Sequence, residues 1–292
     1  MNTVIKFRLS SNPQNLEACL AQYDRTATVE AEYGETLVSG SVITMAHHGS
    51  RAGQPAPCSY PNGIEKAETI EVVGLSHIDL DTVGGCMAIL GVKPEIPSFW
   101  ELAEFVDING PHKLSECNAT DEDVRRLYAY WAWSEANKTF APRDGSVLDV
   151  DNQIAEAMRA IRIILDNNEE LLKAGDEFKA VGEKLNAETF VEESGGVILR
   201  VGPSFVNHLY TSPSKEIAQV VVGFNTTTGG ITVSFADKPQ GLTAKNIVQE
   251  ILGDQAGGHA GIAGSPRGIR CSFDDLKKVY DLARDVVSAT LV

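Results

Sequence analysis

Residues 69–85 read TIEVVGLSHIDLDTVGG, and the expected fold class follows from this stretch. Residues 69–76 form a short apolar run that is typical of a buried strand, and the run ends abruptly at His77. Apolar and small residues then recur at helical spacing from Val83 to Leu90. A strand, a polar turn and a helix in this order predict an α/β fold with a parallel sheet, whose functional groups lie at the carboxyl ends of the strands.

The neighbouring segments extend this pattern toward both ends of an N-terminal domain. Residues 16–23 favour a helix, and the alternation in residues 36–45 (TLVSGSVITM) favours a strand that ends just before a pair of histidines. Residues 103–108 (AEFVDI) predict a further short strand, which is followed by the turn signal NGPH. We therefore expect a parallel-sheet domain over residues 1–135.

The rest of the chain predicts a helical connector and a second, smaller α/β domain. Helical patterning runs from residue 120 to about residue 187, with a break at 142–145. Strand-like segments follow at 196–201, 205–210, 217–224 and 230–235. A helix at 244–252, a glycine-rich loop at 253–268 and a closing helix at 272–287 complete the chain. We assign residues 136–190 to the connector and residues 191–292 to a mixed-sheet C-terminal domain.

The composition limits the classes of protein that the chain can belong to. Its 292 residues suggest about two domains, and 43% hydrophobic with 22% charged residues is typical of a globular protein. No apolar run reaches the roughly 20 residues that span a bilayer, so no membrane association is expected. The five cysteines are scattered and form no CxxC pair, which favours a reducing, cytoplasmic location. A net charge of −15 argues against extensive binding to duplex nucleic acid.

The segment SHIDLD, directly after the predicted strand, contains the densest group of possible metal ligands. Alternation along an extended chain would place His77, Asp79 and Asp81 on one side. A histidine with two carboxylates suits Mn²⁺ or Mg²⁺ better than thiolate-preferring metals. The competing interpretation is a helix N-terminus that is capped by an aspartate and carries an incidental histidine.

A second segment, AGGHAGIAG, lies in the C-terminal glycine-rich loop. Gly257 and Gly258 would let the backbone approach an anion closely, and His259 stands beside them. The competing interpretation is a tight connection with an ordinary histidine. Neither segment alone is specific.

Taken together, SHIDLDTVGG and GGHAGIAG resemble the metal motif and the GGH loop of DHH-family phosphoesterases. The resemblance covers residues from about 69 to 292 and implies a two-domain phosphoesterase that uses two Mn²⁺ or Mg²⁺ ions. It implies that His77, Asp79 and Asp81 are metal ligands and that Asp107 is a catalytic residue bridging the metals. It further implies that His259 is a catalytic group that contacts the substrate phosphate, with Gly257 and Gly258 helping to bind the substrate.

The chain departs from the family pattern at several positions. It contains no Asp-His-His tripeptide, so His112, or His47 and His48 at the end of their own predicted strand, are candidate replacements. The second of these readings requires that the strand at 36–45 joins the same sheet. The Ser-x-Arg pattern before the GGH loop is also missing, and Arg267 or Lys238 would then supply the contact with an anion.

The expected function is hydrolysis of a phosphodiester or phosphoanhydride in a small phosphorylated substrate, such as a nucleotide, a short oligonucleotide or a cyclic dinucleotide. The sequence does not determine the oligomeric state, and a homodimer is one of the possible states. One alternative is a degenerate DHH-like protein that binds a nucleotide without hydrolysis. Another is a metallo-β-lactamase-like hydrolase, but Asp79 and Thr82 stand where that zinc motif needs histidines.

Overall fold

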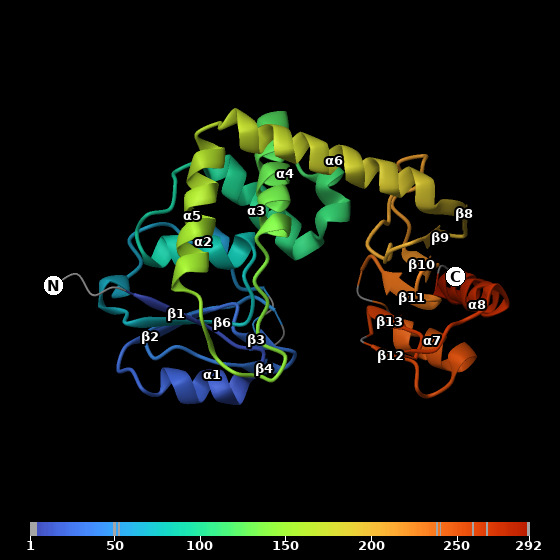
Figure 1. The fold of residues 1–292 in the computed structure, drawn as a ribbon, viewed down its shortest axis with the longest axis horizontal. Coiled ribbons are helices and arrows are strands. Elements are labelled where there is room, and N and C mark those ends of the chain that lie inside the picture. The colour runs from blue at the N-terminus through green and yellow to red at the C-terminus, as the bar shows by residue number, and fades with distance from the viewer. Residues whose placement is uncertain are drawn as a thin grey trace. The chain divides into compact units, whose positions relative to one another are not determined.

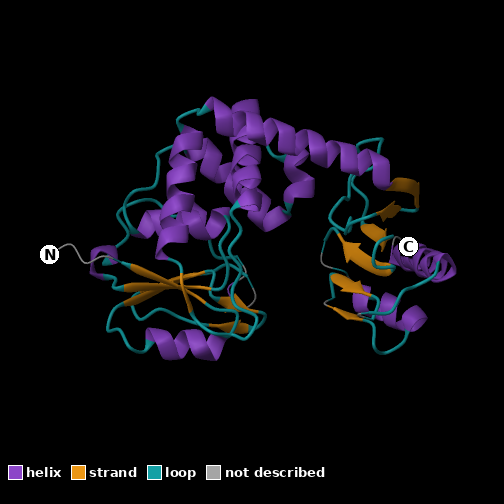
Figure 2. Ribbon diagram, viewed as in Figure 1, coloured by secondary structure: helices purple, strands orange, loops and turns teal. Residues whose placement is uncertain are grey.

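A computed structural model describes residues 5–48, 51, 53–237, 239, 241–258, 260–266 and 268–290. Contacts divide the chain into two compact units. Unit 1 comprises Met1–Asn109 with Glu116–Lys179, and unit 2 comprises Gly110–Ser115 with Ala180–Val292. Each unit combines a sheet with helices, so the predicted two-domain α/β class is confirmed (Figures 1 and 2).

The sheet of unit 1 is mostly parallel, with the strand order β5-β2-β6-β1-β7. Its parallel strands are β5 (Ile43–Met45), β2 (Thr26–Val29), β6 (Val72–Leu75) and β1 (Lys6–Leu9), and β7 (Leu148–Asp149) is antiparallel to β1. Every residue of β2 and β6 is buried, as expected for central parallel strands that are covered on both faces.

Helices cover both faces of this sheet (Figure 1). α1 (Pro13–Leu20) lies on one side, and α2 (Leu80–Ile89) and α5 (Asp151–Leu165) lie on the other, as Figure 1 shows. α3 (Pro97–Asn109) and α4 (Asp121–Ala136) pack with this second group, and α6 (Glu169–Thr189) follows α5. A small hairpin of β3 (Glu32–Tyr33) and β4 (Thr36–Leu37) leaves the sheet after β2.

All residues of α2 are buried, and two glycines permit its close packing against the short 3-10 turn Pro57–Ser59. A Cβ at Gly84 would lie 2.6 Å from the Cβ of Cys58, and a Cβ at Gly85 would lie 2.7 Å from the Cβ of Pro57. The glycine pair of SHIDLDTVGG therefore serves helix packing. The packed turn is important because it also contacts the candidate site.

Unit 2 contains a mixed sheet with the strand order β12-β13-β11-β10-β9-β8. Its strands are β8 (Phe190–Ser194), β9 (Val197–Gly202), β10 (Val220–Asn225), β11 (Gly230–Phe235), β12 (Gly257–Gly258) and β13 (Ile262–Gly264). α7 (Ala244–Leu252) and α8 (Phe273–Thr290) pack on it, and their apolar residues join those of the strands in one core. The predicted turn at TTTGG is confirmed, because β10 and β11 form an antiparallel hairpin there.

Two predicted strands are wrong, and a third is divided into two. Residues 103–108 belong to α3, where Phe99, Leu102, Ala103 and Val106 are buried at the spacing of one helical face. Residues 36–45 form two short strands, because the chain turns at Gly40, where a Cβ would lie 2.7 Å from the Cα of Ala27. Residues 205–210 form no strand.

The contacts also divide the chain differently from the predicted segments 1–135, 136–190 and 191–292. α5 and the first part of α6 group with unit 1, so the boundary falls inside α6 rather than at either end of a separate connector. Within the described residues, no helix is both long enough and apolar enough to cross a membrane.

Candidate metal centre

Five ionisable side chains meet at one edge of the sheet in unit 1, and we call them the histidine–carboxylate cluster. Glu30 directly follows β2, and His47 and His48 follow β5, the neighbour of β2. Asp81 lies in the first turn of α2, after β6 on the other side of β2. Because these strands are parallel and adjacent, their carboxyl ends bring the residues together. Asp107 reaches the cluster from α3.

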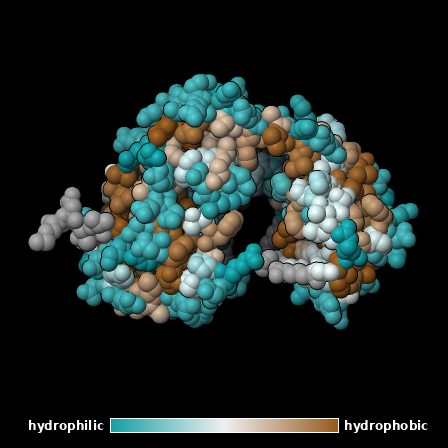
Figure 3. Space-filling model, viewed as in Figure 1, coloured by the Kyte–Doolittle hydropathy of each residue, from teal (hydrophilic) through white to brown (hydrophobic). Residues whose placement is uncertain are grey.

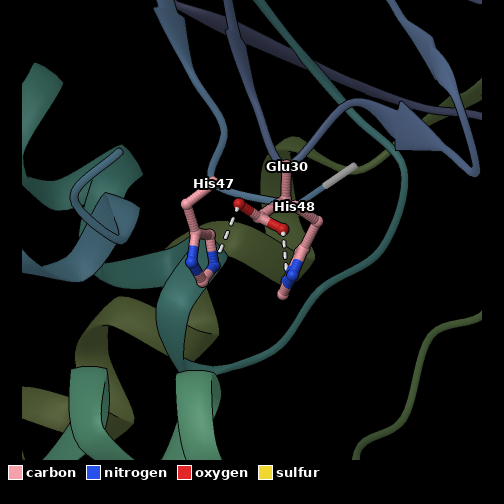
Figure 4. A group of neighbouring side chains, drawn as sticks. All are labelled: Glu30, His47 and His48. Carbon is pink, nitrogen blue, oxygen red and sulfur yellow. Dashed lines mark ion pairs between the residues drawn. The ribbon is translucent and has the colours of Figure 1, made fainter. Parts of the chain in front are cut away.

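The imidazole of His47 lies at the centre of the cluster. Its Nε2 atom is 2.7 Å from Asp107 Oδ2 and 3.6 Å from both Asp81 Oδ2 and Glu30 Oε1. The Nε2 atom of His48 is 3.4 Å from Glu30 Oε2 and 3.7 Å from Asp107 Oδ2. Figure 4 shows the Glu30 carboxylate reaching toward both imidazoles. Two overlapping triads, Glu30-His47-His48 and His47-Asp81-Asp107, each have ligand atoms within 4.8 Å of one another.

The residues of the cluster fit a bound cation. Glu30 Oε1, His47 Nε2, Asp81 Oδ2 and Asp107 Oδ2 are buried, and none has a hydrogen-bond partner at an acceptable angle among the described residues. Buried polar atoms are nearly always paired, because leaving one unpaired costs about 1–3 kcal/mol. No lysine or arginine among the described residues forms an ion pair with these carboxylates. Carboxylate oxygens with imidazole nitrogens form a donor set that suits Mn²⁺, and Mg²⁺ through the oxygens.

Burial and mutual repulsion perturb the acids of the cluster. Burial, followed by the negative charge of Asp81, raises the pKa of Glu30 to about 9. Burial, followed by the charge of Asp107, raises the pKa of Asp81 to about 7. Burial alone would lower the pKa of His47, but Asp107 and Asp81 outweigh it and the pKa is raised. Burial is therefore the main cause of both raised acid pKa values, and the neighbouring carboxylates add to it, as expected for acids that share one buried site.

Asp81 is oriented by the turn that packs against α2. Its Oδ1 atom accepts a hydrogen bond of 2.7 Å from the backbone N–H of Cys58, which leaves Oδ2 directed at His47. The buried ammonium of Lys93 holds the same turn by donating to the carbonyl of Cys58 and, at 2.7 Å, to that of Tyr60. One carboxylate oxygen is therefore used for the fold and the other remains for a ligand.

Glu30 has an unusual backbone for a side chain of its size, with a φ of 50°. Non-glycine residues in this left-handed region cost roughly 1–3 kcal/mol and are often found at functional sites. The Glu30 N–H donates to the carbonyl of Met45 at 2.9 Å, and the Glu30 carbonyl accepts from Ser76 Oγ. These bonds to β5 and to the segment after β6 hold the strained residue at the sheet edge.

His77 and Asp79 form an ion pair with each other, and neither belongs to the two triads. His77 Nε2 lies 3.1 Å from Asp79 Oδ2, and both side chains are more than 40% exposed. Asp79 Oδ1 caps α2 by accepting from the N–H of Thr82 at 2.8 Å. The prediction that Asp79 and Asp81 lie on one side of an extended segment is wrong, because the helix begins at Leu80. The N-cap interpretation holds for Asp79.

The condition for involving His47 and His48 is met, because β5 joins the sheet next to β2. His112 is found elsewhere: it lies in the 3-10 segment Pro111–Glu116, and its ring centroid is 4.6 Å from that of Tyr210 in unit 2.

Gly257 and Gly258 form β12 and line a cavity of about 790 Å³ in unit 2. Hydroxyl side chains contribute to its lining, namely Thr228, Thr232 and Ser265. His259, Arg267 and Lys238 lie outside the described residues.

The sequence patterns did not single out Glu30, the acid whose pKa is raised most in the cluster. A signal was present: TATVE is a short run of β-formers that ends in a carboxylate, as VVGL ends just before SHIDLD. The run is only four residues long, which is too short for periodicity to distinguish it from a loop.

Comparison with known proteins adds little to this description. No protein-family model matches the chain, and no curated protein matches it. Among solved structures, an uncharacterized protein from Helicobacter pylori G27 is similar at 12% identity, with 95% of this chain and 88% of that chain covered. The TM-score of 0.21 is too low to support a conclusion about fold or function.

Proposed function

We propose that this chain is a metal-dependent phosphoesterase whose histidine–carboxylate cluster holds divalent cations, Mn²⁺ or Mg²⁺. The observation that supports the metal site is the convergence of four buried polar atoms at the carboxyl edge of a parallel sheet, where the three carboxylate oxygens lie within ion-pair distance of His47 Nε2 but none of the four atoms forms a hydrogen bond with a described residue. The reaction class rests on the resemblance of residues 76–85 to the DHH metal motif. The substrate would be a small phosphorylated molecule with a phosphodiester or phosphoanhydride bond.

The residues of the cluster divide into distinct roles under this proposal. Glu30, Asp81 and Asp107 supply negative oxygens, and His47 and His48 supply neutral nitrogens. Divalent ions bound there would lower the pKa of a coordinated water and neutralise charge on the phosphoryl oxygens. The two overlapping triads, which share His47, are compatible with two ions.

The surroundings of the cluster support the same role. The side chains of Glu30, His47 and Asp81 are at most 3% exposed, so they hold ligand atoms away from bulk water. His48 is 51% exposed, which leaves one side of the cluster open to a substrate. No lysine or arginine among the described residues pairs with the acids of the cluster, so binding of a phosphate group there is expected to require the metal.

The experiment has two readouts, metal binding and hydrolysis. Calorimetry should show Mn²⁺ binding to the wild type, and Mn²⁺ at a hundredfold excess over its Kd should raise the free energy of unfolding by about 2.7 kcal/mol relative to EDTA. The protein should then hydrolyse bis(p-nitrophenyl) phosphate in a Mn²⁺-dependent way. Asp107→Asn should lose both properties, whereas Glu101→Gln, an exposed acid on the same helix, should keep them.

The outcomes separate the alternatives. A wild-type protein that binds no Mn²⁺ or Mg²⁺ contradicts the proposal. Metal binding with tight nucleotide binding, but with no turnover of any phosphodiester or phosphoanhydride in a nucleotide panel, would establish the non-hydrolytic alternative instead.

A further inference from the structure

Both histidines after β5 reach the same carboxylate, that of Glu30. Successive side chains of a strand point to opposite faces of the sheet, so continued extension would separate His47 from His48. Instead, their Nε2 atoms lie 3.6 and 3.4 Å from the two oxygens of Glu30. Their ring centroids are 4.0 Å apart. The backbone must therefore turn between Met45 and His48, beyond the end of β5.

The side chain of Glu32 holds this turn. Its Oε2 atom accepts hydrogen bonds from two consecutive backbone N–H groups, that of His47 at 3.1 Å and that of His48 at 3.0 Å. Two successive N–H groups directed at one oxygen form a small anion-binding concavity. Glu32 itself lies in β3, two residues after Glu30, and is held by the β3–β4 pairing with Leu37.

We propose that Glu32 is a positioning residue for the metal centre and acts through the backbone of His47 and His48. This assignment rests on the proposed function, because positioning the two imidazoles matters only if they bind a metal. Glu32 is absent from both ligand triads of the cluster. Its carboxylate sets the direction of two ligands by fixing the peptide groups to which they are attached.

Two substitutions distinguish whether Glu32 acts through its negative charge or through its hydrogen bonds. Glu32→Gln removes the charge but keeps an amide oxygen that can accept both bonds, whereas Glu32→Ala removes both. Glu35→Ala is the matched control, since Glu35 is an exposed acid in the turn of the same hairpin and its loss changes the net charge equally.

The first measurement is metal-free amide exchange of His47 and His48 by NMR in the full chain. Both amides should exchange at least about tenfold faster in Glu32→Ala than in the wild type. They should be unchanged in Glu35→Ala and close to wild type in Glu32→Gln. Unchanged exchange in Glu32→Ala would overturn the assignment, whatever the metal data show.

The second measurement is the Kd for Mn²⁺ by calorimetry. Loss of a residue that orients metal ligands typically weakens binding by about 10–100-fold. We expect that loss in Glu32→Ala, recovery to within about threefold in Glu32→Gln, and wild-type affinity in Glu35→Ala. Equal weakening in the alanine and glutamine variants would overturn the assignment in favour of charge. A wild type without Mn²⁺ binding would instead refute the proposed function, and this assignment with it.

Discussion

The histidine–carboxylate cluster of unit 1 and Arg200 of unit 2 are both buried charged groups, but only Arg200 is fully partnered. The guanidinium of Arg200 is 0% exposed and has no acidic partner among the described residues. It donates at 2.6 Å to the carbonyls of Leu209 and Asn186, and it also bonds Thr189, Thr211 and the side chain of Asn186. In the cluster, by contrast, four buried atoms from four residues lack a hydrogen-bond partner.

This difference separates a buried charge whose hydrogen bonds are all made within the fold from a cluster that, under the proposed function, would bind a cation. Arg200 joins the end of α6 and β9 to the loop after β9, so its many bonds stabilise unit 2. Burial lowers its pKa to about 10, which still leaves it charged at neutral pH. The carboxylates of the cluster have only the two histidines as ion-pair partners among the described residues, and under the proposed function a cation would supply the missing positive charge. Removing a residue should therefore damage stability in the first case and function in the second.

The largest expected effect is on catalysis, in Glu30→Gln. The substitution keeps the shape of the side chain, and burial with the neighbouring acids raises the pKa of Glu30 to about 9, so the metal-free carboxyl is already mostly neutral near pH 7. Metal-free stability should therefore stay close to that of the wild type. Metal catalysis contributes several kcal/mol, and each ~1.4 kcal/mol is tenfold in rate, so Mn²⁺-dependent hydrolysis should fall by at least about a hundredfold. Thermal unfolding in EDTA and kinetics with Mn²⁺ test the two parts. A variant that is both less stable and fully active would refute this view of Glu30.

The next effect is on stability, in Arg200→Met. This substitution leaves several acceptors of Leu209, Asn186 and Thr211 unpaired, each at about 1–3 kcal/mol if water cannot reach it. We expect a loss of at least about 3 kcal/mol in the free energy of unfolding, measured with denaturant, and an unchanged affinity for Mn²⁺. Arg270→Met is the control, because the exposed Arg270 also donates to two carbonyls, those of Thr226 and Thr227. It should cost less than about 1 kcal/mol. Similar losses of unfolding free energy in both variants would mean that the burial of Arg200 does not increase its contribution to stability.

The smallest effect distinguishes the two glycines of β12. A Cβ at Gly258, where φ is 150°, would lie 2.5 Å from the Cα of Ala263, whereas a Cβ at Gly257 would meet nothing within 4 Å. Gly258→Ala should therefore destabilise the protein by about 1–3 kcal/mol, and Gly257→Ala should stay within about 0.5 kcal/mol of the wild type. Denaturant unfolding of both variants tests this. Equal stabilities of the two variants would indicate that the fold does not require glycine at position 258. Close approach of a ligand to the backbone would then be the remaining explanation for both glycines.

The sequence predicted the fold well where one pattern dominated a long segment. The helix at 244–252 and the β10–β11 hairpin match their predictions, and the parallel-sheet class of unit 1 follows from residues 69–90 alone. Short segments failed, because residues 103–108 satisfy both periodicities until the buried face of the whole of α3 is known. The same ambiguity of short runs concealed β2, and with it Glu30.

For the candidate site, the sequence by itself determined which residue types stand near strand ends: imidazoles at 47, 48 and 77 and carboxylates at 79 and 81. Only the tertiary structure decided which of them meet. Strand order places β5 beside β2 and β2 beside β6, which brings Glu30 together with His47, 17 positions away in sequence, and with Asp81, 51 positions away. Asp107 joins them from α3.

Burial is the second property that the sequence could not supply. Figure 3 shows mixed hydrophilic and hydrophobic residues over the surface, and no linear pattern distinguishes a solvated acid there from a buried one such as Asp81. The physical reason is that the energy of a charge depends on the atoms around it in space, whereas hydrophobic periodicity depends only on neighbours along the chain.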